Sequence, residues 1–416
     1  MTRHSRRSKP AADLISQLPA DVKDLILTFL PTRDAARTAL LSTNWMNVWY
    51  NHGHLVFDSD FFRLFRLTHH RLDCIKTINN VLMLRAGQVH KFELHINHRD
   101  DPTPEQSDLY RWCLFLSRKG IVELELSISY PRRRYTLPNC ILSCPTINLL
   151  LLRGFVLDCP VEPRIVLPSV QLLVLEDVEF KPNVSGIATS FPNLKELVLF
   201  PCDGISNFVF NAPKLTGLGA IVSPYVTDEW GCFALHQTQI QTLLLSTDPL
   251  WLKSDAITSP VFPVAPSLEI IKVRGINFAC KKDTNLAIQF LQKCPKLMDL
   301  RIDGASPYVH LTSSEDVIPS VLEDSINGGF IIDKDLVMLK TVMIQPFHGF
   351  KQEMHYVRTI LLKSPVLEEL VIMGSCNVNA SMSLMITREL MSFPRASPKA
   401  RIVFMEYQDC WDCWFS

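Results

Sequence analysis

The chain has 416 residues, with 42 lysines and arginines against 42 aspartates and glutamates, so its formal net charge at pH 7 is zero. A balanced charge provides no broad basic surface, and we therefore expect neither nucleic acid nor an anionic membrane as a partner. At this length the chain has room for two or three domains or for one array of repeats.

Residues 1–12 are basic and lack an apolar core, which predicts a disordered tail and no secretory signal. The longest apolar stretches, such as residues 147–152, are too short to span a bilayer. We therefore expect a cytoplasmic and/or nuclear protein whose twelve cysteines are reduced thiols. Cys410 and Cys413 have metal-like spacing but no second ligand pair, and Cys140 and Cys144 are equally isolated. We predict no metal site and no cofactor.

Residues 14–49 have the pattern of three short helices. Apolar residues from Val22 to Leu30 recur at helical spacing, and Pro31 ends that helix. Thr32 can cap a second helix, and Ser42 can cap a third that carries Trp45 and Trp49 on one face. Three helices of this size are too few to bury two tryptophans alone, so the segment is expected to have a packing partner.

The same segment resembles the F-box, which we assign to residues 13–52. The matching motifs are Leu-Pro, a helix ending Phe-Leu-Pro, Arg-Asp-Ala-x-Arg-Thr and Leu-Ser-x-x-Trp-x-x-x-Trp. The F-box family docks on the Skp-type adaptor, and through it on the cullin, of a Skp–cullin–F-box ubiquitin ligase. The resemblance implies that the docking residues are Leu18, Pro19, Val22, Ile26, Leu30, Leu41 and Trp45. Lys23, Thr43, Asn44 and Met46 depart from the family pattern, which implies weaker docking. The alternative is a helical cap that only shields the next domain.

A repeated motif, Pro-x-Leu-x-x-Leu-x-Leu, follows in residues 53–330. The prolines at 145, 168, 192 and 213 are 23, 24 and 21 residues apart. Leucines two apart share one side of a strand, and one strand cannot bury that side without stacked neighbours. Period and motif resemble the irregular leucine-rich repeats of plant F-box proteins. An ordinary α/β domain with buried parallel strands is the alternative. The copies begin at Pro145, Pro168, Pro192, Pro213, Ile240, Pro266 and Pro295, with weaker ones at Val89 and Ile121.

The register of the motif predicts which residues face away from the core. If Leu150 and Leu152 point inward, the other side of the sheet is apolar over the middle repeats and charged over the last two. A contiguous exposed apolar patch often marks a binding surface. We therefore predict that a client protein or small ligand binds Leu149, Leu151, Leu172, Val174, Val198, Phe200 and Leu244, with Lys272, Arg274 and Arg301 contacting polar or acidic groups. The alternative is that loops or short helices cover this patch.

Residues 331–416 resemble the FBD domain of plant F-box proteins. The matching features are Leu339-Lys-x-Val342, a glycine turn at Gly349, a helix over 353–362 and Pro365-x-Leu-Glu-x-Leu. Residues 388–405 are expected to form another helix and a final strand. Physically, this region can close the open end of a repeat array.

Motifs of catalysis are not found in the sequence, which has no phosphate-binding glycine loop and no Gly-x-Ser-x-Gly. The histidines at 52, 54, 95 and 98 are interpreted as surface or capping residues without a metal ligand nearby. The triple arginine 132–134 is interpreted as a solvated loop, with phosphate contact as a lesser alternative.

The sequence thus predicts an α/β chain: a three-helix F-box, an irregular leucine-rich-repeat solenoid with a parallel sheet, and an FBD-type cap. The resemblance implies a non-enzymatic substrate receptor of a ubiquitin ligase. The alternative function is a non-ligase repeat scaffold that mediates protein–protein interaction.

Overall fold

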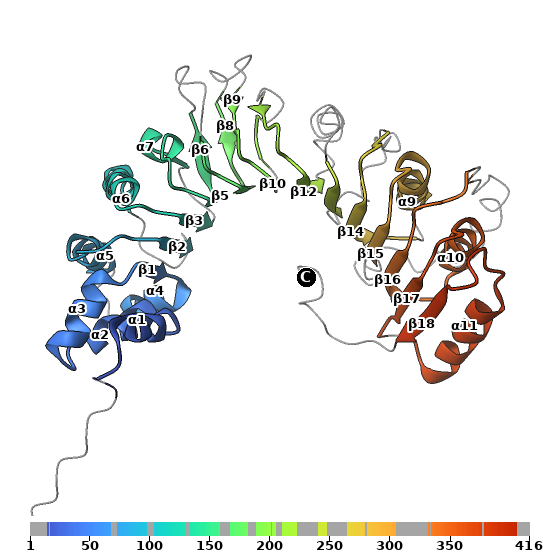
Figure 1. Cartoon of the computed structure of the whole chain (residues 1–416), viewed down its shortest axis with the longest axis horizontal. Helices are drawn as coiled ribbons and strands as arrows, with labels where there is room; N and C mark the ends of the chain where they lie inside the picture. Colours follow the sequence, from blue (N-terminus) through green and yellow to red (C-terminus); the bar gives the residue numbers. More distant parts are fainter. Residues whose placement is uncertain are drawn as a thin grey trace, which may run out of the picture. The chain divides into compact units, whose positions relative to one another are not determined.

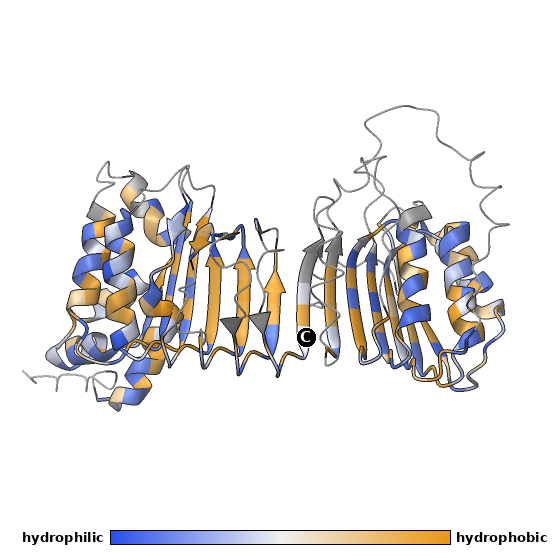
Figure 2. Ribbon diagram, turned by 90° about the horizontal axis from the view of Figure 1, so that it is seen from above, coloured by the Kyte–Doolittle hydropathy of each residue, from blue (hydrophilic) through white to orange (hydrophobic). Residues whose placement is uncertain are grey.

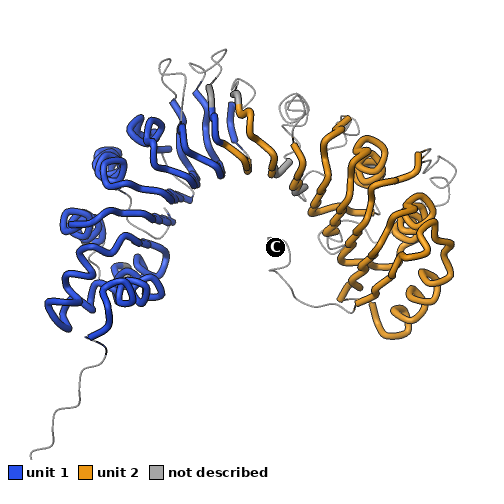
Figure 3. The backbone as a smooth tube through the Cα atoms, in the orientation of Figure 1, with its two compact units in different colours: residues 1–193, 202–211 blue, residues 194–201, 212–416 orange. Residues whose placement is uncertain are grey.

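The computed structural model describes residues 15, 17–67, 73–97, 104–129, 134–158, 167–181, 189–200, 202–204, 210–222, 240–247, 264–278, 281–304, 332, 334–376 and 378–405. The chain divides into two compact units (Figure 3). Unit 1 contains residues 1–193 and 202–211, and unit 2 contains residues 194–201 and 212–416. The boundary between the units falls inside the predicted repeat region, and the predicted domain limits stay predictions.

Unit 1 begins with the three expected helices, α1 (Ala20–Thr28), α2 (Thr32–Thr38) and α3 (Thr43–Asn51). Their core contains Leu27, Ala35, Trp45 and Trp49, all nearly inaccessible to solvent. Ser42 caps α3 as expected, since its hydroxyl accepts a hydrogen bond from the backbone N–H of Trp45 at 3.3 Å. The predicted three-helix module is confirmed.

The expected cap of α2 is wrong. Thr32 is the first residue of that helix, and Pro31 precedes it without a side-chain cap. The Thr32 hydroxyl instead accepts the backbone N–H of Val56 at 2.8 Å, in the strand that follows the three helices. A proline before the helix fixes the entry of the chain, which leaves the hydroxyl available for a partner outside the helix.

The strands of unit 1 form a parallel sheet in the order β1-β2-β3-β5-β7. Helices precede β2, β3 and β5 in the chain, and α5, α6 and α7 lie along one side of the sheet (Figure 1). A second, short parallel sheet pairs β4, β6 and β8, and β9 pairs with β11. The elements after α3 are β1 (His54–Phe57), α4 (Ser59–Leu67), α5 (Asp73–Met83), β2 (Lys91–Asn97), α6 (Gln106–Arg118), β3 (Glu123–Ser129), β4 (Tyr135–Thr136), α7 (Asn139–Leu142), β5 (Leu149–Arg153), β6 (Phe155–Leu157), β7 (Leu172–Glu176), β8 (Glu179–Phe180), β9 (Thr189–Ser190) and β11 (Phe210–Asn211).

Unit 2 is a longer run of parallel strands in the order β10-β12-β13-β14-β15-β16-β17-β18. Its helices alternate hydrophobic and hydrophilic residues, as expected for helices with one buried side (Figure 2). The elements are β10 (Glu196–Leu199), β12 (Gly217–Val222), β13 (Thr242–Thr247), β14 (Ile270–Ile276), α9 (Lys281–Lys293), β15 (Asp299–Gly304), β16 (Thr341–Phe347), α10 (Lys351–Lys363), β17 (Glu369–Gly374), α11 (Ala380–Ser392) and β18 (Arg401–Met405).

The repeated motif accounts for the sheet of each unit. In β5 and β7 the burial alternates, with the motif leucines inside and their neighbours partly exposed. The leucine-type residue ahead of each strand is buried too, so copies such as those of β5 and β7 place three apolar side chains in the core. These leading residues are Val89, Ile121, Ile147, Val170, Leu194, Leu215, Ile240, Leu268, Leu297, Leu339 and Leu367. The predicted pattern of inward and outward residues is seen in β5 and β7, whereas Gly219, predicted to face outward on β12, is buried.

The C-terminal region continues the same arrangement. The helix expected over 353–362 is α10, and the final strand expected near 401–404 is β18, whereas the last helix lies earlier than expected, at Ala380–Ser392. The turn before α10 is closed by Glu353, whose carboxylate accepts the backbone N–H groups of His348 at 2.9 Å and Phe350 at 3.0 Å. Gly349 has a positive φ of 79°, a conformation that glycine adopts without strain. The region is built as further repeats, and its assignment as an FBD cap stays a prediction.

Candidate interaction surfaces

Large apolar side chains are exposed on the three-helix module. Val22 and Leu25 on α1 and Phe29 after it follow helical spacing, so they form one stripe along the helix. Phe29 is 80% exposed, and Leu40 and Leu41, which follow α2, are 86% and 68% exposed. Exposed residues of this size, grouped on one small module, are typical of a surface that binds another protein. We call Val22, Leu25, Phe29, Leu40 and Leu41 the helical docking surface.

The seven predicted adaptor-binding residues are distributed between surface and core. Pro19, Val22 and Leu41 are exposed, whereas Leu18, Ile26 and Leu30 are half-buried. Trp45 is only 2% exposed and packs inside the module. Contact of these seven residues with an adaptor stays a prediction. Without a rearrangement of the module, Trp45 cannot contact an adaptor directly and packs beneath the exposed residues. Leu25, Phe29 and Leu40 are exposed residues that the sequence argument did not select, although Leu25 and Phe29 lie at helical spacing from Val22.

Lys23, the most unusual residue of the module, is 4% exposed. Its ammonium nitrogen lies over the ring of Trp45, 5.6 Å from the centroid, which is the geometry of a cation–π contact. The aliphatic stem of the lysine therefore occupies a core position that the family pattern gives to an aliphatic residue. The departure at residue 23 changes the interior of the module and not its exposed stripe.

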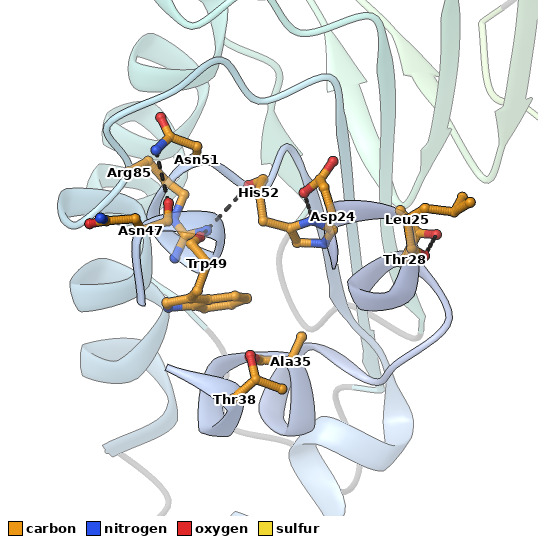
Figure 4. A network of polar contacts seen from close by, with 10 residues as sticks. All are labelled: Asp24, Leu25, Thr28, Ala35, Thr38, Asn47, Trp49, Asn51, His52 and Arg85. Atoms are coloured by element: carbon orange, nitrogen blue, oxygen red, sulfur yellow. Dashed lines mark hydrogen bonds and ion pairs between the residues drawn. The ribbon is translucent and has the colours of Figure 1, made fainter. Parts of the chain in front are cut away.

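Polar contacts fasten the module to the first repeats (Figure 4). Arg85, which follows α5, is 4% exposed and donates hydrogen bonds to the backbone carbonyls of Trp49 and of His52, the latter at 3.2 Å. Its guanidinium also lies 4.0 Å from the centre of the Trp49 ring, and burial lowers the pKa of Arg85 to about 10. His52 Nδ1 lies 2.7 Å from Asp24 Oδ1 on α1. These contacts join the end of α3 to the segment after α5 and to α1.

Unit 1 has an open face, the side of its sheet with partly exposed side chains. Neighbouring strands align Leu149 with Leu172 and Leu151 with Val174, the register that the sequence predicted. Arg153 and Glu176 stand next along β5 and β7 and pair at 3.1 Å. The four apolar residues are half-buried, so they present a modest apolar patch bordered by an ion pair.

Unit 2 has an open face of different character. One row across its strands aligns Val198, Gly219, Leu244, Lys272, Arg301, Met343, Val371 and Val403. A Cβ at Gly219 would approach Cγ1 of Val198 to 3.1 Å, so Val198 leans over β12. Phe200 follows β10 and is half-buried. In this row the predicted apolar residue Leu244 is therefore followed on the next two strands by the basic residues Lys272 and Arg301.

The basic residues on this part of the open face have acidic neighbours. Arg274 Nε lies 3.0 Å from Asp303, and Arg301 Nε lies 3.2 Å from Asp299. Lys272 stands directly opposite Arg301. Burial and the like charge of Arg301 lower the pKa of Lys272. Burial raises the pKa of Asp303, against the opposing effect of Arg274. This part of the open face thus mixes charges of both signs beside an apolar segment.

A third group was missed by the sequence argument. Glu93 and His95 on β2 and Glu125 on β3 each offer one potential metal-ligand atom, and these atoms lie within 4.8 Å of one another. The expectation that His95 has no carboxylate nearby is wrong. The signal was present, because residues two apart in a strand point to the same side, so Glu93 had to lie beside His95.

The other motifs noted in the sequence do not assemble a site in the part of the chain that the structure describes. Cys140 and Cys144 are free thiols, and Cys410 and Cys413 lie outside the described residues. Arg132 and Arg133 also lie outside them. Arg134 forms ion pairs with Asp177 at 2.6 Å, Asp203 at 2.7 Å and Glu179 at 3.3 Å, which ties three segments of unit 1 together. Among the described helices, none is both long and apolar enough to cross a membrane.

The fold and its surfaces define a class of protein: a helical docking module attached to a parallel-stranded repeat region. Residues 15–56 match the model of the F-box domain. The F-box/FBD/LRR-repeat protein At1g13570 of Arabidopsis thaliana is 28% identical over 441 aligned residues, which cover 95% of this chain and 99% of that protein. The FBD-associated F-box protein At3g52670 of the same plant is 24% identical, over 86% of this chain and 72% of its own length. Over most of its length the chain is therefore similar to plant F-box proteins with FBD regions and leucine-rich repeats.

Proposed function

We propose that this chain is a substrate receptor of a Skp–cullin–F-box ubiquitin ligase. One observation supports this proposal most directly: the helical docking surface is apolar and exposed while the core beneath it is filled. Residues such as Phe29 and Leu40 expose apolar area to water, and their burial against a partner would be favourable. The match to the F-box domain supports a Skp-type adaptor as that partner.

In this function the chain contributes position and not chemistry. The adaptor would hold the receptor on the cullin, and the repeats would hold the client near the subunits that transfer ubiquitin. Proximity alone can account for large rate effects when the two reactants are held together. Arg85 and Thr32, which fasten the module to the sheet, would keep the client at a fixed orientation to the adaptor.

We propose further that the open faces receive the client. In unit 1 the contact residues would be Leu149, Leu151, Leu172 and Val174. In unit 2 they would be Val198, Phe200 and Leu244, with Lys272, Arg274 and Arg301 facing polar or acidic groups of the client. The aligned register in each unit supports this assignment, because it places Leu149 beside Leu172 and Leu151 beside Val174 in unit 1. In unit 2 it places Leu244, Lys272 and Arg301 in one row.

Two matched pairs of variants test the client surface. Leu151→Asp with Val174→Asp should abolish client capture by unit 1, whereas Val56→Asp, on the same face at β1, should not. In unit 2 the double variant Val198→Asp with Leu244→Asp should likewise abolish client capture. The distant Val403→Asp is its control and should not. Adaptor binding serves as the folding control, since none of these residues belongs to the helical docking surface. Full client capture by both double variants would contradict the assignment.

The alternative function, a repeat scaffold without a ligase role, makes a different prediction. Co-precipitation of the Skp-type adaptor and cullin with the wild-type chain, compared with a Leu18→Ala, Pro19→Ala variant, separates the two functions. A receptor recovers both subunits and the variant recovers less. If the wild-type chain recovers neither, the ligase function is wrong and the scaffold is favoured.

A further inference from the structure

The group formed by Glu93, His95 and Glu125 lies on the open face of unit 1. The register of β2 and β3 places Glu93 directly opposite Glu125, and His95 stands two residues further along β2 on the same side. Two carboxylates directly opposite each other in a sheet repel each other, and a nearby cation relieves this repulsion. We call these three residues the Glu–His–Glu cluster.

The imidazole of His95 lies beside one of these carboxylates. Its Nε2 atom has practically no solvent exposure and lies 2.9 Å from Glu125 Oε1, so the two groups form an ion pair when His95 is protonated. When the imidazole is neutral, Nε2 of His95 and Oε1 of Glu125 are two donor atoms close enough to bind the same metal ion. Imidazole with carboxylate oxygens is a donor set that zinc and similar ions use in proteins.

From this geometry we propose that the Glu–His–Glu cluster binds one divalent transition-metal ion, of which Zn²⁺ is the representative. In a tetrahedral site with metal–ligand distances of about 2.0–2.2 Å, neighbouring ligand atoms are about 3.3 Å apart. The His95–Glu125 pair, at 2.9 Å, already approximates this separation. Three protein ligands leave a fourth position for water.

Glu93 is the ligand that has to move. Its carboxylate now lies 2.8 Å from the ammonium nitrogen of Lys91, which also lies 3.5 Å from Glu123. A change of side-chain rotamer would bring Glu93 into the site. The adjustment breaks one half-buried ion pair, between Lys91 and Glu93. The ligands come from two neighbouring strands, so the ion would also join β2 to β3.

Zn²⁺ titration of the full chain by calorimetry tests this proposal. The variants are His95→Asn and Glu125→Gln, and the matched control is Glu123→Gln, which removes a carboxylate of the same face outside the cluster. All variants keep the twelve cysteines, so zinc binding by thiols is common to them and cancels in the comparison. We expect the wild-type chain and Glu123→Gln to bind one more equivalent of Zn²⁺ than the two cluster variants.

The thermal midpoint provides the second readout, because an ion that binds the native state raises it. Zn²⁺ should raise the midpoint of the wild-type chain and of Glu123→Gln more than that of either cluster variant. Equal stoichiometry and equal shifts in all four proteins would overturn the proposal. The proposal would also be overturned if Glu123→Gln bound one equivalent of Zn²⁺ fewer than the wild-type chain. Zinc binding would then depend on the number of carboxylates on this face and not on the Glu–His–Glu cluster.

Discussion

The attachment of the helical module to the sheet leads to a sharp prediction at Thr32. Its hydroxyl accepts the backbone N–H of Val56 at 2.8 Å, on β1, the edge strand that pairs only with β2 among the described strands. Thr32→Val keeps the size of the side chain and removes the acceptor. Thr32→Ser keeps the acceptor and removes only a methyl group, which makes it the matched control.

The magnitude follows from the unpaired amide. A buried donor left without a partner costs about 1–3 kcal/mol. Val56 is half-buried and can be partly rehydrated, so we take the lower part of that range, about 1–2 kcal/mol. Local opening at β1 should then become about 5- to 30-fold more frequent.

Hydrogen–deuterium exchange of the backbone measures this directly. Peptides that contain residues 54–57 should exchange about 5- to 30-fold faster in Thr32→Val than in the wild-type chain, with little change in Thr32→Ser. Peptides from β16 to β18, in unit 2, serve as the internal reference. If β1 exchanges at the same rate in all three proteins, the Thr32 hydrogen bond does not hold the module to the sheet.

Three further predictions concern buried or paired charges. Arg85→Lys should lower the free energy of unfolding of the first repeats by about 2–3 kcal/mol, because a lysine cannot supply the hydrogen bonds of the guanidinium. Denaturant unfolding followed by the fluorescence of Trp49 measures this change in free energy. Arg134→Ala should make unit 1 more sensitive to proteolysis at low salt than at high salt, since three carboxylates then face one another without a cation; no salt dependence would contradict this. Contact with Glu125 raises the pKa of His95, against the effect of burial. The stabilisation by this pair is therefore full below pH 6.5 and is lost as the pH rises through the folded-state pKa of His95. In an NMR titration without metal, Glu125→Gln should lower the pKa of His95.

The sequence predicted the sheet well because each copy of the repeat motif specifies its own strand. Leu150 and Leu152 could be assigned to the core from a spacing of two, and pairing copies by their prolines fixed Leu149 opposite Leu172. This register was predictable because it is set locally by each repeat.

The contacts that join distant segments were not predictable in this way. Thr32 has the spacing of a helix cap, and only the position of β1 in three dimensions makes Val56 its partner. Arg85 is a single basic residue in sequence, yet it is buried beside Trp49, 36 residues away. Exposure on the helical module was equally hidden, because both Trp45 and Phe29 fit the apolar pattern while one is buried and the other exposed.

The central claim, that the helical module docks on a Skp-type adaptor, is tested most directly by one dissociation constant. Isothermal titration of the purified adaptor into the full chain should give a measurable affinity for the wild type, and Phe29→Asp with Leu40→Asp should weaken it at least about 100-fold, since each buried side chain contributes about 1.5–3 kcal/mol. Met83→Asp, which changes an equally exposed residue on α5, should bind like the wild type. Wild-type affinity in the Phe29→Asp, Leu40→Asp variant would contradict the account.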